Sequence, residues 1–426
     1  MNNLKELNLI NVSNVSDISV LETQTNNNSN FKLSVLFLNN INIDLSTVQN
    51  TISRLGDINS YWTQYHINGL IIYNRELLDK LSVCKNITKL QLFNGYSNQY
   101  SDTIGKYTGE IDISECTSLK SLVVYNVGCS FKLPSSLTNY QVAWNTGISD
   151  LSNCSLLEKI HYSDSTMISK ISTELATIPE NCTTLHTIEM CVGTENKAED
   201  FEFLECVSDC TNLKNIIIRE NADGGWRALY IDSPTGLRHL TNLESVNIGF
   251  SSNNKINKMK LPDLTGLREL KSFTVSNGNV YDITNAATYT SLTGLHISNG
   301  SFSNLNALSN LTNLTSVTLT NNKIINVYGL ANLENLTYLN LNNNNINDVK
   351  PLENLKKLET LYLQNNALYD SSYDKNGKAY YTLTVFSDLN QNQDGKLKNL
   401  HLSGNNIEDF SMLQDSNLKW DDKSGW

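Results

Sequence analysis

The sequence is poor in charged residues and contains no long apolar run. Charged residues make up 18% of the 426 residues, below the usual share in soluble domains, while Asn, Ser and Thr are abundant. No stretch of about 18 consecutive apolar residues occurs, which is the shortest length that suggests a membrane-crossing helix. We therefore expect neither a transmembrane helix nor membrane insertion.

Basic residues are too few for a surface that binds nucleic acid. The chain has 32 Lys and Arg against 43 Asp and Glu, which gives a net charge of -11. Because phosphate binding needs clustered Lys and Arg, this balance argues against nucleic acid as the main partner. An acidic surface could instead attract a basic protein.

Common enzyme and metal-site motifs are missing as well. The phosphate-binding pattern G-x-x-x-x-G-K-[ST], the zinc-protease pattern H-E-x-x-H and the hydrolase pattern G-x-S-x-G do not occur. The sequence has no C-x-x-C pair, and its 6 His residues are scattered, so the usual spacing of zinc ligands is absent. We predict a protein that is not an enzyme, with no catalytic residue, no cofactor and no metal site.

The sequence does contain a repeat between positions 311 and 368. The apolar triplet Leu314, Val317 and Leu319 recurs every 22 residues as L-x-x-L-x-L, and each copy is followed by an Asn. The matched Asn residues are Asn322, Asn344 and Asn366. A fixed period of about 20–29 residues with this pattern is typical of leucine-rich repeats.

The spacing has a physical reason. The two apolar residues of L-x-L point to the same side of a short strand, because side chains alternate along a strand. One such strand with its return arc cannot bury its apolar side alone, so neighbouring repeats must stack. The recurrent Asn follows the strand, where the chain turns. Its side chain can satisfy backbone groups there, and repetition predicts a ladder of amides.

The apolar pair can be followed through the whole chain and predicts about sixteen strands. The predicted pairs are Leu7/Leu9, Leu36/Leu38, Leu70/Ile72, Leu90/Leu92, Leu122/Val124, Tyr140/Val142, Ile160/Tyr162, Ile188/Met190, Ile216/Ile218, Val246/Ile248, Phe273/Val275, Leu295/Ile297, Val317/Leu319, Leu339/Leu341, Leu361/Leu363 and Leu400/Leu402. Leu229/Ile231 is a doubtful additional pair. The uneven steps before position 295 are acceptable because only the strands must stay in register, while the arcs can lengthen.

The regular block resembles the internalin-type class of bacterial leucine-rich repeats, on the run N-x-I-x-D-V-x-P-L from Asn344 to Leu352. The pattern C-x-x-L-x-x-I/V in the middle of the chain is similar to BspA-like repeats. The resemblance implies an α/β solenoid, a curved array with a parallel β-sheet on its concave face. Short helices, 3₁₀ turns and loops would then form the convex face. It also implies binding of another macromolecule, often a host protein, on the concave face.

We expect one solenoid over residues 1–426. It divides into irregular, longer repeats (1–231), more regular repeats of about 22 residues (232–368), an insertion (369–396) and a last repeat with a C-terminal cap (397–426). The insertion is assigned to a loop or a convex arc. Trp420 and Trp426 fit a cap over the last coil, and truncation of a longer array is the alternative.

The first repeat begins directly after Met1, and no signal peptide precedes it. Natural arrays cap their apolar ends. The sequence therefore favours a fragment whose signal or cap was left out, while a true start with a frayed first repeat is the alternative.

Three of the longer arcs have apolar residues at nearly helical spacing, which predicts short convex helices. They are Ser46–Tyr61, Arg75–Val83 and Ala198–Val207. Irregular loops are the alternative for some of them. The arc around Trp226, between Ile218 and Val246, is assigned no structure.

Five of the 8 cysteines precede the apolar pair at one fixed offset, in the column that Leu311, Leu333 and Leu355 occupy later. They are Cys84, Cys116, Cys154, Cys182 and Cys210. A thiol in a leucine column behaves as a small buried hydrophobic group, so we predict structural, unpaired cysteines. This prediction is compatible with either export or a reducing compartment.

One run resembles the first half of a calcium loop. Asn390, Asn392 and Asp394 stand at alternate positions before a Gly, as in an EF-hand. The twelfth position is His401 rather than Glu, and the same residue types are common in turns. We therefore interpret the run as a turn.

Exposed aromatic residues beside the strand leucines are the candidate ligand-binding site. Their rings would form a stripe, because parallel strands lie about 4.8 Å apart. The candidates are Phe37, Tyr73, Phe93, Tyr125, Trp144, Tyr338 and Tyr362. Such rings anchor protein interfaces and also stack on sugars. A register error that turns the stripe into core is the alternative.

The sequence thus predicts a non-enzymatic binding protein whose partner is a protein, possibly of a host or a cell surface. By resemblance it is an adhesin-like bacterial protein at the cell surface or in the extracellular space. An intracellular, cytoplasmic scaffold and a glycan-binding surface are the alternatives.

Overall fold

The computed structural model divides the chain into two compact units, each described by itself below. Unit 1 comprises Met1–Gly193 and Cys206–Leu213, and unit 2 comprises Thr194–Glu205 and Lys214–Trp426. The structure describes residues 6–10, 15, 17–27, 33, 35–39, 43–53, 69–72, 78–93, 109–125, 128–143, 147–166, 168–180, 182–192, 199–220, 229–252, 257–373, 376–377, 379–391, 396–413 and 418–421. That the two units form one solenoid stays a prediction.

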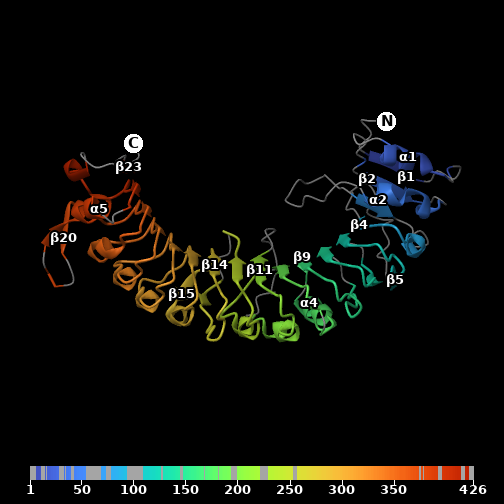
Figure 1. Ribbon diagram of the computed structural model, residues 1–426, viewed down its shortest axis with the longest axis horizontal. Helices are drawn as coiled ribbons and strands as arrows, with labels where there is room; N and C mark the ends of the chain where they lie inside the picture. Colours follow the sequence, from blue (N-terminus) through green and yellow to red (C-terminus); the bar gives the residue numbers. More distant parts are fainter. Residues whose placement is uncertain are drawn as a thin grey trace. The chain divides into compact units, whose positions relative to one another are not determined.

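Among the described residues, unit 1 contains eight strands that form one parallel ladder (Figure 1). Each strand pairs with the next one in the ladder. The strands are β1 (Glu6–Ile10), β2 (Val35–Asn39), β3 (Gly69–Ile72), β4 (Lys89–Phe93), β6 (Ser121–Tyr125), β8 (Asn139–Ala143), β9 (Lys159–Thr166) and β10 (Thr187–Val192). Leu122 lies opposite both Leu90 and Tyr140, so the apolar columns are aligned.

Unit 2 contains a second parallel ladder, with nine strands in its described part. They are β11 (Asn215–Glu220), β12 (Ser245–Gly249), β14 (Ser272–Ser276), β16 (Gly294–Ser298), β17 (Ser316–Thr318), β18 (Tyr338–Asn340), β19 (Thr360–Tyr362), β22 (Asn399–His401) and β23 (Lys419–Asp421). In Figure 1 these strands line the inner side of the arc that unit 2 forms, while the turns lie outside. This curved parallel solenoid is the predicted fold.

Short helices and 3₁₀ turns form the side opposite the strands. The α-helices are α1 (Ser19–Asn27), α2 (Gln49–Ser53), α4 (Ile168–Leu175) and α5 (Thr382–Gln391). The 3₁₀ turns are η1 (Leu45–Val48), η2 (Lys80–Val83), η3 (Glu202–Val207), η4 (Thr235–His239), η5 (Thr284–Thr288), η6 (Asn306–Leu308), η7 (Tyr328–Leu330), η8 (Lys350–Asn354) and η9 (Ser411–Leu413). Two short parallel pairs are also present. They are β5 (Glu110–Asp112) with β7 (Ser130–Lys132) and β13 (Met259–Lys260) with β15 (Val280–Asp282). In the chain, each of these short strands comes after a strand of the ladder.

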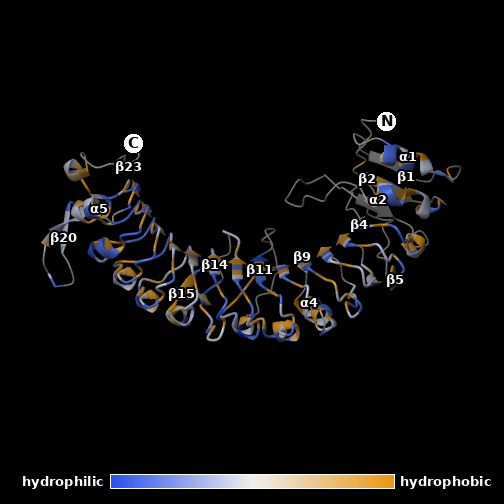
Figure 2. Cartoon of the chain, in the orientation of Figure 1, coloured by the Kyte–Doolittle hydropathy of each residue, from blue (hydrophilic) through white to orange (hydrophobic). Residues whose placement is uncertain are grey.

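The core consists of the apolar columns that the repeat predicts. Each of the sixteen predicted L-x-L pairs, apart from the doubtful additional one, has at least its first member in a strand of the two ladders. Leu339, Leu341 and Leu361 are examples of fully buried members. Figure 2 shows apolar and polar residues alternating along the strands and turns. The period therefore determines both the strands and the side that each one buries.

Three details differ from the expectation. Leu229 and Ile231 are buried but form no strand of the ladder, because this segment bonds to its neighbours on the turn side, where the Lys260 N–H donates to the Asp232 carbonyl. The strand β3 is offset by two residues, since Leu70 lies opposite Leu92 rather than Leu90. The insertion, expected to be a loop or arc, contains α5.

The predicted convex helices are present in shortened form. Ser46–Tyr61 is η1 followed by α2, and residues 54–61 lie outside the described part. Arg75–Val83 ends in η2, while Ala198–Val207 contains the 3₁₀ turn η3 rather than an α-helix. Tight 3₁₀ turns suit arcs in which few residues connect neighbouring strands.

The Asn ladder is present as predicted in unit 2. The Asn344 Nδ2 donates to the Leu319 carbonyl of the preceding repeat at 2.8 Å and to the Leu341 carbonyl of its own repeat at 2.9 Å. Its Oδ1 accepts a hydrogen bond from the Ile324 N–H at 3.1 Å. Asn366 makes the same set of bonds one repeat later. Asn344 and Asn366 thus each complete the loop of the repeat before them, whereas the Oδ1 of Asn322 has no hydrogen-bond partner among the described residues.

A second polar column opens the turns on the convex side, and we name it the Asx column. In each case a side-chain oxygen of Asp or Asn accepts the backbone N–H two residues later, which starts the turn. Its members are Asp17, Asp44, Asp112, Asp150, Asp200, Asp263, Asp282, Asn304, Asn326, Asp348 and Asp409. Carboxylates that serve as caps account for part of the chain's acidity.

The cysteine column lies in the core of unit 1, as the offset predicts. Cys84, Cys116, Cys154 and Cys182 are fully buried, and Cys210 is 4% exposed. Burial raises the pKa of Cys84 to about 12 and that of Cys116 to about 11. Cys84 and Cys116 are therefore neutral packing groups at neutral pH.

The insertion is attached to the convex side of unit 2. It forms the antiparallel pair β20 (Ser371–Tyr373) and β21 (Ala379–Tyr381), followed by α5. The Tyr380 hydroxyl donates to Asp348 Oδ1 at 2.7 Å and accepts from the Val349 N–H at 3.0 Å. The hairpin is thus held on a member of the Asx column, away from the strand face.

Candidate functional site

The predicted aromatic residues are described to different extents. The side chains of Tyr125, Tyr338 and Tyr362 are described, and each is half-buried. Phe37 and Phe93 are placed by their backbones in β2 and β4. Tyr73 and Trp144 lie outside the described residues.

In unit 1 the predicted stripe is short in its described part. Tyr125 lies opposite Phe93 on one neighbouring strand, as predicted, and opposite Ala143 on the other. Ala143 is 2% exposed and adds no ring. The use of this row as a ligand-binding site stays a prediction.

In unit 2 the strand face carries a stack of three rings, formed by Tyr338, Tyr362 and His401. Tyr362 and His401 are opposite each other on β19 and β22. Their ring centroids are 4.3 Å apart, and the planes differ by 6°. The Tyr338 ring lies 5.8 Å from that of Tyr362 and is tilted by 51°. This aromatic stack spans three neighbouring strands.

A ladder of neutral polar side chains runs beside the aromatic stack. The Asn342 Nδ2 donates to Gln364 Oε1 at 3.0 Å, and the Gln364 Nε2 donates to Ser403 Oγ at 2.8 Å. The Asn342 Oδ1 accepts from the Gln364 backbone N–H at 2.7 Å. These bonds fix the side chains before any partner arrives, which lowers the entropy lost on binding.

His401 covers one face of the Tyr362 ring in the aromatic stack. One side of the Tyr362 ring faces His401 on β22 in a near-parallel stack. Tyr338 lies on β18, the strand on the other side of β19. A stacked ligand needs an open ring face, whereas protein side chains also pack against ring edges. The arrangement therefore favours protein contacts over stacking of a flat sugar ring on Tyr362.

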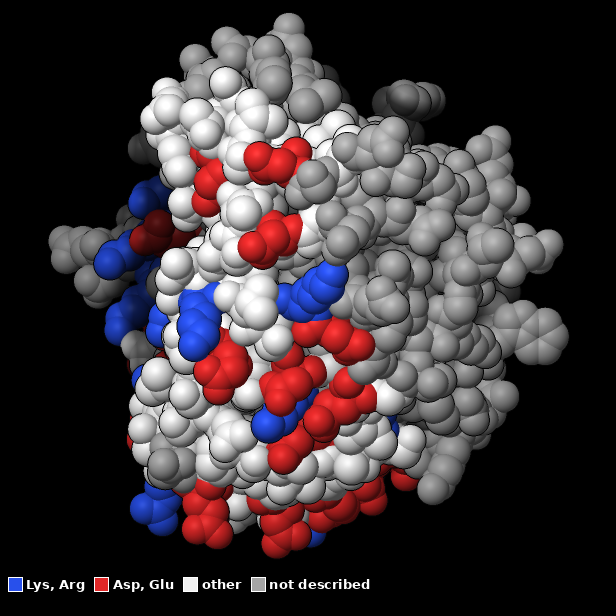
Figure 3. Space-filling view, turned by 90° about the vertical axis from the view of Figure 1, so that its right-hand side faces the viewer, with Lys and Arg blue, Asp and Glu red and all other residues white. Residues whose placement is uncertain are grey.

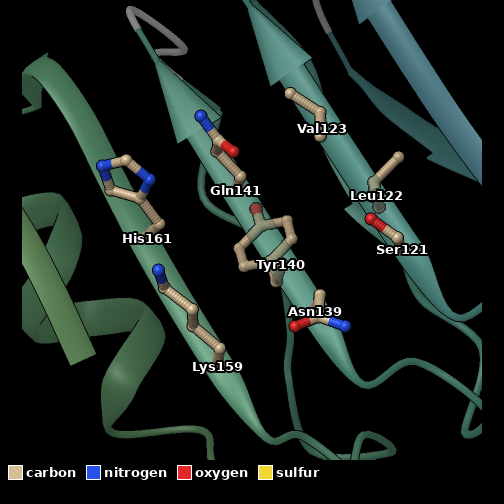
Figure 4. A pocket seen from close by; sticks show the side chains of 8 residues that line it. All are labelled: Ser121, Leu122, Val123, Asn139, Tyr140, Gln141, Lys159 and His161. Atoms are coloured by element: carbon tan, nitrogen blue, oxygen red, sulfur yellow. The ribbon is translucent and has the colours of Figure 1, made fainter. Parts of the chain in front are cut away.

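Unit 1 has a shallow hollow of about 220 Å³ on its strand face. It is lined by Ser121, Leu122, Val123, Asn139, Tyr140, Gln141, Lys159 and His161. Figure 4 shows that these side chains come from three neighbouring strands, with Lys159 and His161 on β9 next to Asn139 and Gln141 on β8. The hollow is open and has both polar and apolar lining, which suits a side chain of a partner rather than an enclosed cofactor.

The hollow borders a small charged group. Lys159 Nζ lies 3.2 Å from Glu189 Oε2 on β10, and His161 Nε2 lies 4.0 Å from Glu189 Oε1. The Glu189 side chain is 11% exposed, so its charge is compensated by these neighbours. The strand face of unit 1 is therefore charged, unlike that around the aromatic stack.

Charged side chains of both signs also occur on the outer side of unit 1. Lys132 pairs with Asp112 at 3.0 Å, and Lys85 pairs with Glu115 at 3.7 Å. Figure 3 shows acidic and basic side chains next to one another on the face it presents. Exposed pairs of this kind add little to binding or stability.

The calcium hypothesis gains no support from the described part of the run. The Asn390 side chain donates to the Leu397 carbonyl at 2.8 Å and closes its own loop, while Asn392 and Asp394 lie outside the described residues. Within the described ranges, no three His, Cys, Asp or Glu side chains gather in a way that could hold a metal ion.

Sequence reasoning missed His401 as a member of the site. It was considered only as a position of the calcium pattern, although the alignment of Leu361 with Leu400 places it opposite Tyr362. Gln364 and Ser403 occupy one row for the same reason. These residues can be found from the sequence by aligning the repeat before the insertion with the repeat after it.

Comparisons with known proteins agree with this geometry. Residues 334–373 match the family model for leucine rich repeats (2 copies). An internalin of Listeria monocytogenes shares the fold with 21% identity over 90% of this chain and 95% of its own, at a TM-score of 0.53. A leucine-rich repeat protein of Leptospira interrogans is 18% identical over 80% and 91%, at a TM-score of 0.40. A search of curated protein sequences finds no match.

The chain has the fold of a leucine-rich repeat solenoid, and residues 334–373 match the leucine-rich repeat model. The solenoid is similar to that of the internalin, as the internalin-type run of the regular block predicts. The BspA-like character of the middle repeats stays a prediction. No helix in the described ranges has the length and apolar character that crossing a membrane requires.

Proposed function

We propose that this chain is a non-enzymatic protein that recognises another protein through the strand face of unit 2. The observation that carries the proposal is the aromatic stack of Tyr338, Tyr362 and His401 beside the ladder from Asn342 to Ser403. Tyr is enriched at the centres of protein interfaces, and pre-ordered side chains lose little entropy on binding. The fold supports a binding scaffold, because a solenoid presents a long regular surface.

We further propose that the protein acts at a bacterial cell surface or after secretion, with a cell-surface or host protein as partner. The shared fold with an internalin of Listeria monocytogenes supports this setting. A second candidate is an intracellular scaffold. Six cysteines are free thiols, as is usual for proteins in reducing compartments, namely Cys84, Cys116, Cys154, Cys182, Cys206 and Cys210. Protease treatment of intact cells, followed by detection of the remaining protein, distinguishes the two locations.

The binding proposal is tested by two matched double variants. Tyr338→Ala with Tyr362→Ala removes two rings of the aromatic stack. Tyr281→Ala with Tyr369→Ala removes two Tyr residues of unit 2 that lie outside the strands of its ladder and are 48% and 55% exposed. Wild type and both variants are immobilised and exposed to bacterial and host surface extracts, and a glycan array is probed in parallel.

We expect a protein captured by the wild type and by the control variant, and lost about tenfold or more with the strand-face variant. Circular dichroism must show that both variants remain folded. Equal capture by all three proteins would contradict the proposed site. Binding to glycans that depends on Tyr338 and Tyr362 would instead establish a carbohydrate-binding surface.

A further inference from the structure

The strand face around the aromatic stack contains no Asp, Glu, Lys or Arg over seven neighbouring strands, β12 to β22. Each strand has three outward positions, counting the residue just past the shorter strands, and the register of the ladder aligns them in rows. These positions are Ser245, Asn247, Gly249, Ser272, Thr274, Ser276, Gly294, His296, Ser298, Ser316, Thr318, Thr320, Tyr338, Asn340, Asn342, Thr360, Tyr362, Gln364, Asn399, His401 and Ser403. We name this surface the neutral face.

The absence of charge is specific to this surface. At the chain's own frequency of 18%, about four charged residues would be expected there, and more at surface positions, which charged residues prefer. Charges return at both borders within unit 2, with Arg219 on β11 and Lys419 on β23. The strand face of unit 1 also carries charge, at Lys159 and Glu189.

The composition of the neutral face is that of a recognition surface. Its side chains are almost all hydroxyls, amides and aromatic rings, and all but Ser298 are half-buried. Hydroxyls and amides can both donate and accept hydrogen bonds, so they adapt to a partner's groups. Antibody combining sites use the same set of residues, Tyr, Ser, Gly and Asn. Depletion of charge at the centre with charge at the rim is the usual anatomy of a protein interface.

We propose that the neutral face binds a patch of a partner protein that itself carries no charged side chain at its centre. This inference rests on the proposed function and adds the chemistry of the partner. A partner's Lys or Asp placed on this face would lose its water and find no opposite charge, which is strongly unfavourable. By contrast, neutral polar groups and exposed backbone of a partner would find both hydrogen-bond donors and acceptors on the neutral face.

The dimensions of the neutral face fit the centre of an interface. Seven strands about 4.8 Å apart span about 29 Å, and three outward positions along each strand span about 13 Å. This area is smaller than a whole interface, which buries about 800 Å² on each partner. The charged borders at Arg219 and Lys419 would then belong to the rim.

The test places opposite charges at one central position. Thr318 is half-buried on β17, the middle strand of the seven, and lies between His296 and Asn340. Thr318→Lys and Thr318→Glu are compared with wild type. Thr274→Lys and Thr274→Glu repeat the comparison on β14 in case the first pair disturbs folding, which circular dichroism reports. The probe is a phage-displayed library of random peptides of about 16 residues, long enough to cross most of the face.

We select clones that bind the wild type and keep those whose binding falls about tenfold or more with Tyr362→Ala. In these face-dependent clones we expect fewer charged residues than in the unselected library. The Lys and Glu variants should weaken them to a similar extent. Salt screens exposed charge pairs and therefore weakens only binding that depends on them. The affinity of these clones should thus change less than about twofold between about 50 mM and about 500 mM NaCl.

Two results overturn the inference in distinguishable ways. If face-dependent clones are enriched in one sign of charge, and Thr318→Lys and Thr318→Glu change their binding in opposite directions, the face binds protein but its partner is charged. If no clone depends on Tyr362, the proposed binding site itself is wrong, and the inference is overturned with it.

Discussion

Lys170 and Glu174 form an ion pair inside unit 1, one turn apart on α4. Their side chains are 6% and 0% exposed. The Glu174 Oε1 also accepts a hydrogen bond from the Ser149 N–H at 2.7 Å, and the Ser149 Oγ lies 3.0 Å from the Tyr140 hydroxyl. Burial lowers the pKa of Lys170, while the nearby carboxylate opposes this shift. The pair thus connects the convex helix to the core of the ladder.

Removing one partner of this pair should destabilise unit 1 strongly. Lys170→Met leaves the Glu174 carboxylate buried without its counter-charge, and we expect a loss of about 3–5 kcal/mol in the free energy of unfolding. The double variant Lys170→Met with Glu174→Leu should recover most of the loss, since it buries no charge. Urea unfolding followed by circular dichroism measures both.

The control for this prediction is Lys132→Met, which breaks the exposed pair with Asp112. The two side chains of that pair are 50% and 49% exposed, so we expect a change of less than about 1 kcal/mol. An equal effect of Lys132→Met and Lys170→Met would show that burial is not what makes the second pair important.

The amide ladder should be sensitive to single substitutions. Asn344→Ala removes the acceptor of the Ile324 N–H and the donor to the Leu319 and Leu341 carbonyls, all in the interior. We expect a loss of at least about 2 kcal/mol, because buried polar groups lose their partners. Asn345→Ala, next to it but exposed, is the matched control. Similar thermal midpoints for the two variants would contradict the role of the ladder.

Stability should fall in acid through the Asx column. Hydrogen bonds from the hydroxyl and N–H of Thr265 hold the pKa of Asp263 below its ordinary value, and those from Ser114 lower the pKa of Asp112 to about 2. When folding lowers the pKa of a carboxyl, that carboxyl stabilises the folded protein fully at any pH above its unfolded pKa of about 4. The stabilisation is lost as the pH falls through the folded pKa. We therefore expect the urea midpoint to decrease between about pH 4 and about pH 2.

The variant Asp263→Asn tests the origin of this pH dependence. Asn can accept the same backbone N–H without titrating, as Asn304 and Asn326 do elsewhere in the column. The variant should retain its stability at neutral pH and show a shallower decrease in acid. If its pH profile coincides with that of the wild type, other groups cause the acid sensitivity.

Cys84 and Cys154 should be unreactive until the core opens. Burial raises the pKa of Cys84 and Cys154 to about 12, so neither forms a thiolate at neutral pH. A short treatment of the native protein with iodoacetamide should modify the exposed Cys206 before these two. Peptide mapping measures each site, and urea should make all eight sites react. Early modification of Cys84 would place it outside the core.

The ladders could be predicted because their cause is local and repeated. The pair Leu339/Leu341 is recognisable within three residues, and its recurrence determines which strand lies next to it. The same reasoning was wrong for Leu229 and Ile231, since an apolar pair on the turn side has the same alternation as a strand. Local pattern thus predicts burial more reliably than it predicts the side of the solenoid.

The rest of the site depends on contacts that no single repeat contains. His401 stacks on Tyr362 across the insertion, so the usual step of 22 residues does not relate them. The buried pair on α4 was missed because Lys and Glu in a sequence normally indicate an exposed helix surface. The neutral face is visible only when outward positions from seven strands are collected in rows.

The amide ladder also determines how such a protein can change length. Asn344, Asn366 and Asn405 each complete the loop of the repeat before them, so the repeats of this block meet their neighbours with the same donors and acceptors. Whole repeats can therefore be gained or lost without redesign of the core. The recognition surface would then grow or shrink in steps of one strand, about 4.8 Å, which lets selection match its reach to a new partner.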